Sequence, residues 1–193
     1  MQKTIIKTAI ITLCAVLIAC AITFGGLSVF APTVMGNFYS EMGKDEKAFG
    51  FYEKAYKKEQ NEENFVKLIN SAIAMEDDEK LIKYFSDYEE NNYSLEEDYL
   101  AFIVGKYCVA QVKANNVDQA FSTAIRYSDG YNAQNPIRYL IAYGLETKNK
   151  LYLTNLLSQL TDFKSTNYNS LSAESKERID QDVANLTTYC EEN

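Results

Sequence analysis

The N-terminal part of the chain contains a long apolar segment without a charged residue. No charge occurs between Lys7 and Glu41, and residues 9–30 are almost entirely apolar. A helix needs about 20 such residues to cross the hydrocarbon core of a bilayer, so this segment is long enough to span it. Cleavable signal peptides have apolar regions of only about 7–15 residues, and Pro32 is poorly suited to a cleavage site. The sequence therefore predicts an uncleaved membrane anchor within residues 1–31.

The same segment also permits a second interpretation, that of a bacterial lipoprotein. Residues 17–20 (Leu-Ile-Ala-Cys) resemble a lipobox, in which the cysteine, here Cys20, is lipidated and everything before it is removed. A lipoprotein usually becomes polar after that cysteine, whereas this chain stays apolar as far as Phe30. We therefore favour the anchor and keep lipidation of Cys20 as the alternative.

The charges that flank the apolar segment predict its orientation. Lys3 and Lys7 precede it, and the first charges after it, Glu41 and Lys44, cancel. The positive-inside rule then places the N-terminus in the cytoplasm and the remaining chain outside the membrane. Small residues four positions apart within the segment would let two such helices pair as a homodimer; they are Ala15 with Ala19 and Ala21 with Gly25.

The composition excludes several classes of function. Without Lys3 and Lys7, 17 of the 19 basic residues stand against 27 acidic ones, a net charge of −10, which argues against a nucleic-acid partner. Histidine is absent, and with it the commonest general base and metal ligand. No glycine-rich phosphate loop occurs outside the apolar segment. We expect no enzymatic activity, no cofactor and no metal site.

Two further features have an ordinary structural explanation. The acidic clusters at 76–79 and 96–98 lack the spacing of a calcium-binding loop and stand where helices are expected to begin. Cys108 and Cys190 are too far apart in the sequence for a zinc or redox motif. We interpret these cysteines as buried free thiols, although a disulfide between them stays open.

Residues 34–58 carry a spaced set of small and aromatic residues. Their offsets are 0, 3, 7, 12, 16 and 19, and the residues are Gly36, Tyr39, Gly43, Ala48, Tyr52 and Ala55. Small residues let two antiparallel helices approach closely, and aromatic side chains fill the gaps on either side. Gly43 marks the turn between the helices, and Asp45 is placed to cap the second. The pattern resembles the tetratricopeptide repeat, a helical hairpin of 34 residues.

The second half of this pattern recurs three times in a weaker form. The successive shifts are 33, 39 and 33 residues, and the sets are Leu81, Phe85 and Tyr88; Ala120, Ala124 and Tyr127; Leu153, Leu157 and Leu160. The resemblance covers about residues 32–162 and implies an α-solenoid of antiparallel helix hairpins.

We therefore predict an all-α domain over residues 32–193. The chain has only 2 Pro and 8 Gly, which favours long helices. A last amphipathic helix over about 171–191 is expected to cap the final repeat. The other expected helices cover residues 33–42, 45–58, 62–75, 77–89, 95–113, 116–127, 135–147 and 149–161.

The resemblance also implies a binding face. In repeat arrays of this family, the first helix of each hairpin lines a concave groove that receives a peptide or a helix of a partner. The outward-facing positions of these helices are Asn37, Asn70, Val109, Lys113 and Arg138. The asparagines would bond an extended backbone, and the two cations an acidic side chain or a terminal carboxylate. Ordinary solvated helix residues would give the same pattern.

The expected function is that of a membrane-anchored adaptor that binds a protein or peptide client on the extracytoplasmic side. The alternatives are a self-association module that assembles a membrane complex, and a lipoprotein with a helical binding domain. The turn at residues 129–131 (Asp-Gly-Tyr) offers a further partner contact, but ordinary turn chemistry explains it equally well.

The anchor and the lipoprotein make opposite predictions for the mature N-terminus. An anchored protein keeps Met1 and stays in the membrane fraction after washes with high salt and at alkaline pH, because an apolar span is released by neither. N-terminal sequencing of the membrane-bound form decides between them. A mature chain that begins at a lipidated Cys20 would establish the lipoprotein.

Overall fold

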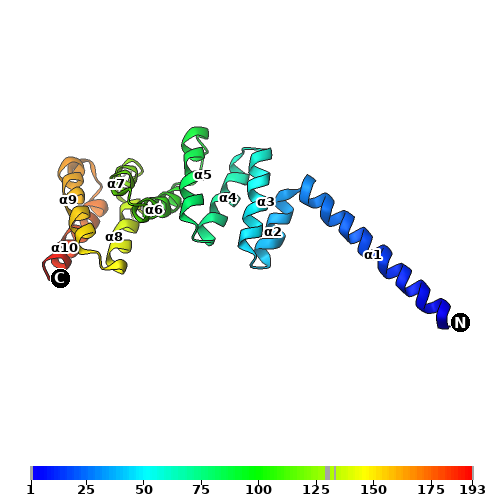
Figure 1. Ribbon diagram of the computed structural model, residues 1–193. Helices are drawn as coiled ribbons and strands as arrows, with labels where there is room; N and C mark the ends of the chain where they lie inside the picture. The colour runs from blue at the N-terminus through cyan, green and yellow to red at the C-terminus, as the bar shows by residue number, and fades with distance from the viewer. Residues whose placement is uncertain (1, 129–130, 133, 193) are drawn as a thin grey trace. The chain divides into compact units, whose positions relative to one another are not determined.

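The computed structural model describes residues 2–128, 131, 132 and 134–192, and all regular structure in this part of the chain is helical (Figure 1). The chain divides into two compact units, unit 1 over Met1–Met75 and unit 2 over Glu76–Asn193. The all-α prediction is therefore confirmed for the described residues.

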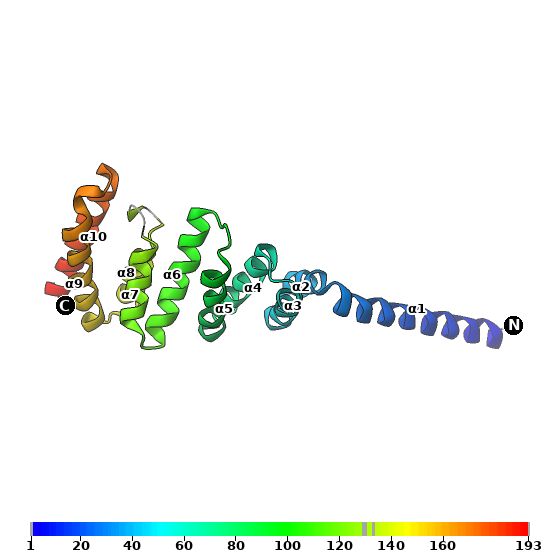
Figure 2. The same ribbon diagram turned by 90° about the horizontal axis from the view of Figure 1, so that it is seen from above.

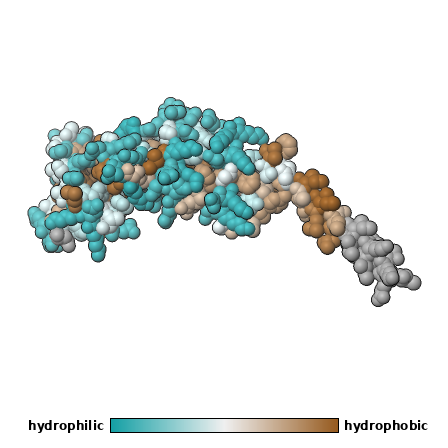
Figure 3. Space-filling model, in the orientation of Figure 1, coloured by the Kyte–Doolittle hydropathy of each residue, from teal (hydrophilic) through white to brown (hydrophobic). Residues whose placement is uncertain are grey.

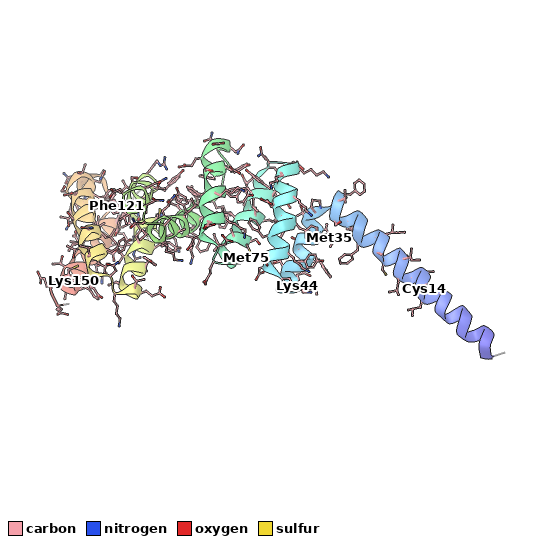
Figure 4. The ribbon with its side chains drawn as sticks, in the orientation of Figure 1. Cys14, Met35, Lys44, Met75, Phe121 and Lys150 are labelled. Atoms are coloured by element: carbon pink, nitrogen blue, oxygen red, sulfur yellow. The ribbon has the colours of Figure 1, made fainter. Side chains whose placement is uncertain are left out.

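Unit 1 consists of four helices. They are α1 (Gln2–Phe30), α2 (Pro32–Glu41), α3 (Asp45–Lys58) and α4 (Glu62–Ala74). Helix α1 extends away from the other three and contacts α2 only near its C-terminal end, and none of its residues from Thr12 to Phe30 is buried (Figure 1). Cys14 lies on this isolated helix, whereas Lys44 lies at the turn between α2 and α3 (Figure 4).

Helices α2 and α3 form a tight hairpin. A Cβ atom added at Gly36 would overlap the ring of Tyr52, so only glycine permits this approach of the two helices. Ala48 is 1% exposed. Gly43 has a φ of 64°, a left-handed conformation that glycine adopts without strain.

The expected cap of α3 is wrong in one detail. Asp45 is the first residue of the helix, and the capping position is occupied by Lys44, without a capping hydrogen bond from its side chain. Because Asp45 already has helical geometry, its carboxylate contributes through the helix dipole and not as a cap.

Unit 2 consists of six α-helices and one short 3₁₀ turn among its described residues. The chain order is α5 (Asp78–Asn91), α6 (Glu97–Lys113), α7 (Val117–Arg126), α8 (Pro136–Thr147), α9 (Lys150–Asn167), η2 (Tyr168–Ser170) and α10 (Ala173–Glu192). From α5 to α10 each α-helix packs against its neighbour in the sequence, and α6 also packs along α8. Figure 2 shows α9 and α10 side by side.

Two glycines of unit 2 repeat the close approach of the first hairpin. A Cβ atom at Gly105 of α6 would overlap the ring of Tyr139 on α8. A Cβ atom at Gly144 of α8 would overlap the side chains of Tyr152 and Leu153 on α9. Helix α8 is therefore held close to a neighbour on two sides.

The observed helix ends agree with the predicted ones within two residues, except at the C-terminal end of α9. That helix continues to Asn167 instead of ending at 161. Phe163 is buried in the extension, so burial of its ring stabilises residues whose polar sequence does not itself suggest a helix.

A charge at Ala48 should unfold the first hairpin. The Ala48→Arg substitution places an unpaired guanidinium at a close helix crossing and should destabilise unit 1 by about 3 kcal/mol or more. Hydrogen exchange of the full-length protein in detergent should show lost protection in α2 and α3. Glu46→Arg is the control, because Glu46 lies two residues before Ala48 on the exposed side of α3. Equal protection in both variants would contradict the packing described for this hairpin.

Candidate functional site

Unit 2 contains a cleft of about 500 Å³ between α8 and α10, both of which pack against α9. Most of its lining is apolar or aromatic and comes from Tyr139, Ile141, Ala142, Leu145, Leu186 and Tyr189. The polar lining residues are Gln134, Arg138, Asp182 and Asn185. The cleft therefore combines apolar walls with a few polar groups, the usual character of a binding site in a protein.

The start of α8 is fixed by local chemistry. The Asn135 side chain caps the helix by accepting a hydrogen bond from the Ile137 amide at 2.9 Å, and Pro136 takes the first helical position. The Ser128 hydroxyl donates to the same Asn135 oxygen at 2.9 Å. The cap holds the first turn of α8 in place. Because Ile137 in this turn is buried, its side of the helix faces the core.

Helix α8 supplies five residues to the cleft, and three of them form a stripe away from its core face. Arg138, Ala142 and Leu145 follow one another at intervals of four and three residues, which places them along one stripe of the helix. Leu140 and Gly144 lie on the buried side. Helix α8 thus separates a core face from a cleft face.

A polar network joins the two walls of the cleft. Arg138 Nε lies 3.2 Å from Asp182 Oδ2, and the Tyr131 hydroxyl donates to the same oxygen at 3.0 Å. The Asp182 side chain is only 12% exposed. Burial, and then the neighbouring Asp182 carboxylate, raises the pKa of Tyr131, so its hydroxyl stays protonated and remains a donor. Arg178 of α10 donates to the Tyr131 carbonyl at 3.3 Å.

Of the five predicted groove residues, Arg138 alone lines this cleft. Lys113 is exposed at the end of α6, and its Nζ lies 3.0 Å from Asp78 Oδ2. The rings of Phe102 and Tyr139, 6.3 Å apart, place the first turn of α8 beside the N-terminal part of α6. Because Lys113 lies eleven residues beyond Phe102, about 16 Å along the helix axis, the structure does not bring Lys113 and Arg138 together.

The other three predicted groove residues lie outside the cleft. Val109 is half-buried on α6, and Asn37 and Asn70 are exposed on α2 and α4 of unit 1. Asn37 accepts a hydrogen bond from the Tyr52 hydroxyl at 2.9 Å, which ties it to the first hairpin.

The repeat positions of the first hairpin have structural roles. Gly36, Ala48, Tyr52 and Ala55 are buried, and Tyr39 stacks on Phe51 with ring centroids 5.4 Å apart. These residues set the spacing of α2 and α3.

Several residues of the cleft have no distinguishing signal in the sequence. Asp182 and Asn185 were not singled out, and Tyr139 and Leu145 carried no signal beyond the helical spacing of α8. Tyr131, which the turn at 129–131 suggested as a partner contact, is fully buried and belongs to the network. Asp129 and Gly130 lie outside the described residues.

The acidic clusters and the cysteines have local explanations. Asp77 caps α5 by accepting from the Lys80 amide at 3.0 Å, and the Lys80 ammonium lowers the pKa of Asp77. Cys108 and Cys190 are free thiols, but Cys190 is only half-buried, contrary to the prediction that both are buried. Cys108 is fully buried, and burial raises the pKa of its thiol to about 12, so it stays protonated and unreactive at neutral pH.

The N-terminal helix fits a membrane anchor by length and composition. The stretch Thr12–Phe30 is long and apolar enough to cross a bilayer, although a signal sequence has the same properties. Cys20 is exposed on this helix.

No protein-family model, curated protein or solved structure matches this chain. A helical architecture alone does not determine a function, because function depends on the site that a fold carries. The cleft between α8 and α10 is therefore the basis for the inferred function.

The pair Arg138–Asp182 should stabilise unit 2 by linking α8 to α10. A double-mutant cycle with Arg138→Gln and Asp182→Asn should give a coupling of about 1 kcal/mol, limited by the partial exposure of the arginine. Denaturant unfolding of the full-length protein in detergent measures this coupling. The pair Glu53–Lys57 within α3, whose lysine is 63% exposed, is the reference and should couple more weakly. Equal coupling in the two pairs would show that the network does not hold the cleft together.

Proposed function

We propose that this protein is a membrane-anchored adaptor that binds a segment of a protein partner in the cleft between α8 and α10. The observation that carries the proposal is the cleft itself, whose walls are mostly apolar and whose edge holds the ion pair Arg138–Asp182. Apolar anchors of a partner would bury against the walls, and the polar edge would fix the register of the bound segment.

The spacing of the walls favours a helix or a short extended peptide of the partner. Arg138, Ala142 and Leu145 line one side as a stripe along α8, and Leu186 with Tyr189 lies on the facing side of α10. A volume of about 500 Å³ is enough for a few large side chains. An amphipathic helix that presents two or three apolar residues at helical spacing has the matching surface.

The repeat register gives independent support. Applied to Asn37, the successive shifts of 33, 39 and 33 residues lead to Asn70, Val109 and then Ala142. Ala142, the fourth member, is exposed and lines the cleft. We therefore propose that the helices form a tetratricopeptide-like array, in which α8 contributes the binding face and α10 borders it as the capping helix.

The position at the membrane follows from α1. We propose that Thr12–Phe30 anchors the chain, and that the positive charges at Lys3 and Lys7 keep the N-terminus in the cytoplasm. The cleft of unit 2 would then meet its partner on the extracytoplasmic side.

A charge on the wall of the cleft should prevent partner binding. A photo-crosslinking residue at Ala142 should capture a discrete protein in the native membrane. The Leu145→Glu substitution should weaken capture tenfold or more, a loss of about 1.4 kcal/mol, because the carboxylate would be buried against an apolar segment. Leu151→Glu is the matched control, since Leu151 is 75% exposed on α9 and does not line the cleft.

The product that is captured from Ala142 distinguishes the alternatives. A crosslink to a second protein that Leu145→Glu abolishes and Leu151→Glu leaves intact supports the adaptor. A crosslink between two copies of this chain would establish self-association in its place. Capture that neither substitution changes would show that the cleft is not the binding site.

A further inference from the structure

Helix α2 carries a stripe of large apolar side chains that remain exposed. Val34 is 53% exposed and Phe38 41%, and Met42, which directly follows the helix, is 50% exposed; their spacing of four residues places them on one side of α2. We call these three residues the α2 stripe. Figure 3 shows hydrophobic surface that continues from α1 onto the adjoining part of unit 1. Such a patch marks an interaction surface, because isolated soluble domains rarely leave one open.

A ring contact ties the α2 stripe to the apolar part of α1. Phe38 packs edge-to-face on Phe24, with ring centroids 5.3 Å apart. Phe24 belongs to the stretch Thr12–Phe30 and lies six residues before its end, about 9 Å back along the helix axis. When α1 spans a bilayer, Phe38 therefore lies deeper in the membrane than Phe30, the last residue of the span.

The remaining surface of α2 is suited to this position. No charged residue occurs between Pro32 and Ser40. Two polar side chains of α2 bond to its neighbours in unit 1: Thr33 donates to Asn64 at 3.3 Å, and Asn37 accepts from Tyr52 at 2.9 Å. Lipid contact along the α2 stripe would therefore leave these polar groups with their partners.

Lysines and aromatic rings border the α2 stripe on the side of α3. Lys47 Nζ lies 5.5 Å from the centre of the Tyr39 ring, and Lys54 Nζ lies 4.9 Å from that of Phe51. Lys58 Nζ donates to the Phe30 carbonyl at 3.3 Å, at the end of the apolar stretch. Aromatic rings with long cationic side chains are typical of the boundary between hydrocarbon and headgroups.

We infer that α2 is a membrane-interface helix, which lies against the extracytoplasmic leaflet with Val34, Phe38 and Met42 in contact with lipid. The inference rests on the proposed anchoring by α1. The bilayer is what covers the α2 stripe, because the stripe is continuous with the surface of α1 through Phe24 and Phe38. The net negative charge of the chain does not oppose this contact, since α2 has no charge before Glu41. The rest of unit 1 then contacts the membrane through α2 and is not attached to it by α1 alone.

The absence of tryptophan from the chain permits a direct test with single reporters. The full-length protein is reconstituted in phosphatidylcholine vesicles whose acyl chains carry bromine near the headgroup or, in a second set, near the chain end. Val34→Trp, Phe38→Trp and Met42→Trp place one reporter each on the α2 stripe. Leu17→Trp reports on the span, and Ala74→Trp, exposed on α4 of the same unit, is the control.

Bromine near the headgroup should strongly quench the tryptophan fluorescence of the three α2 variants. The quenched fraction should be comparable with the fraction of Leu17→Trp fluorescence that bromine near the chain end quenches. Ala74→Trp should stay unquenched. Quenching of Leu17→Trp without quenching of the α2 reporters would overturn the inference and leave the anchor intact. If Leu17→Trp is also unquenched, the anchoring proposal fails and the inference falls with it. Quenching of the α2 reporters that declines as the ratio of protein to lipid rises would show that a second copy covers the stripe in place of lipid.

Discussion

The close packing of a glycine against a large side chain is the contact on which the helical arrangement depends. It occurs at Gly36 against Tyr52 in unit 1, and at Gly105 and Gly144 in unit 2. Any larger residue at these positions would push two helices apart. In unit 2 these contacts position one wall of the proposed site, because Gly105 fixes α8 against α6 and Gly144 fixes it against α9. With two sides of α8 held in this way, the remaining stripe faces the cleft.

Much of the fold could be predicted because its determinants are local. Pro32 and Pro136 begin helices, Gly43 forms a left-handed turn, and Asn149 caps α9 by accepting from the Tyr152 amide. The apolar spacing within each helix then indicates which face is buried. These signals involve residues a few positions apart, so a single sequence contains them in full.

The candidate site was predictable only in part, because it depends on which helix faces which. Arg138 was identified from the repeat spacing, but its partner Asp182 lies 44 residues away on α10, and no local pattern links them. Lys113 was identified in the same way, yet it pairs with Asp78, 35 residues earlier. Tyr131 resembles an exposed turn residue in the sequence, and only the packed structure shows that it is buried and bonded to Asp182.

The central claim is that the cleft between α8 and α10 is occupied by a protein partner at the membrane. Hydroxyl-radical footprinting of Tyr139, Leu145 and Tyr189 tests it most directly, in native membranes and again after purification in detergent. The exposed Leu151 on α9 serves as the internal reference. An occupied cleft predicts that the three residues react more slowly in native membranes than in the purified protein, with no change at Leu151. Equal rates at all four residues in the two preparations would contradict the claim.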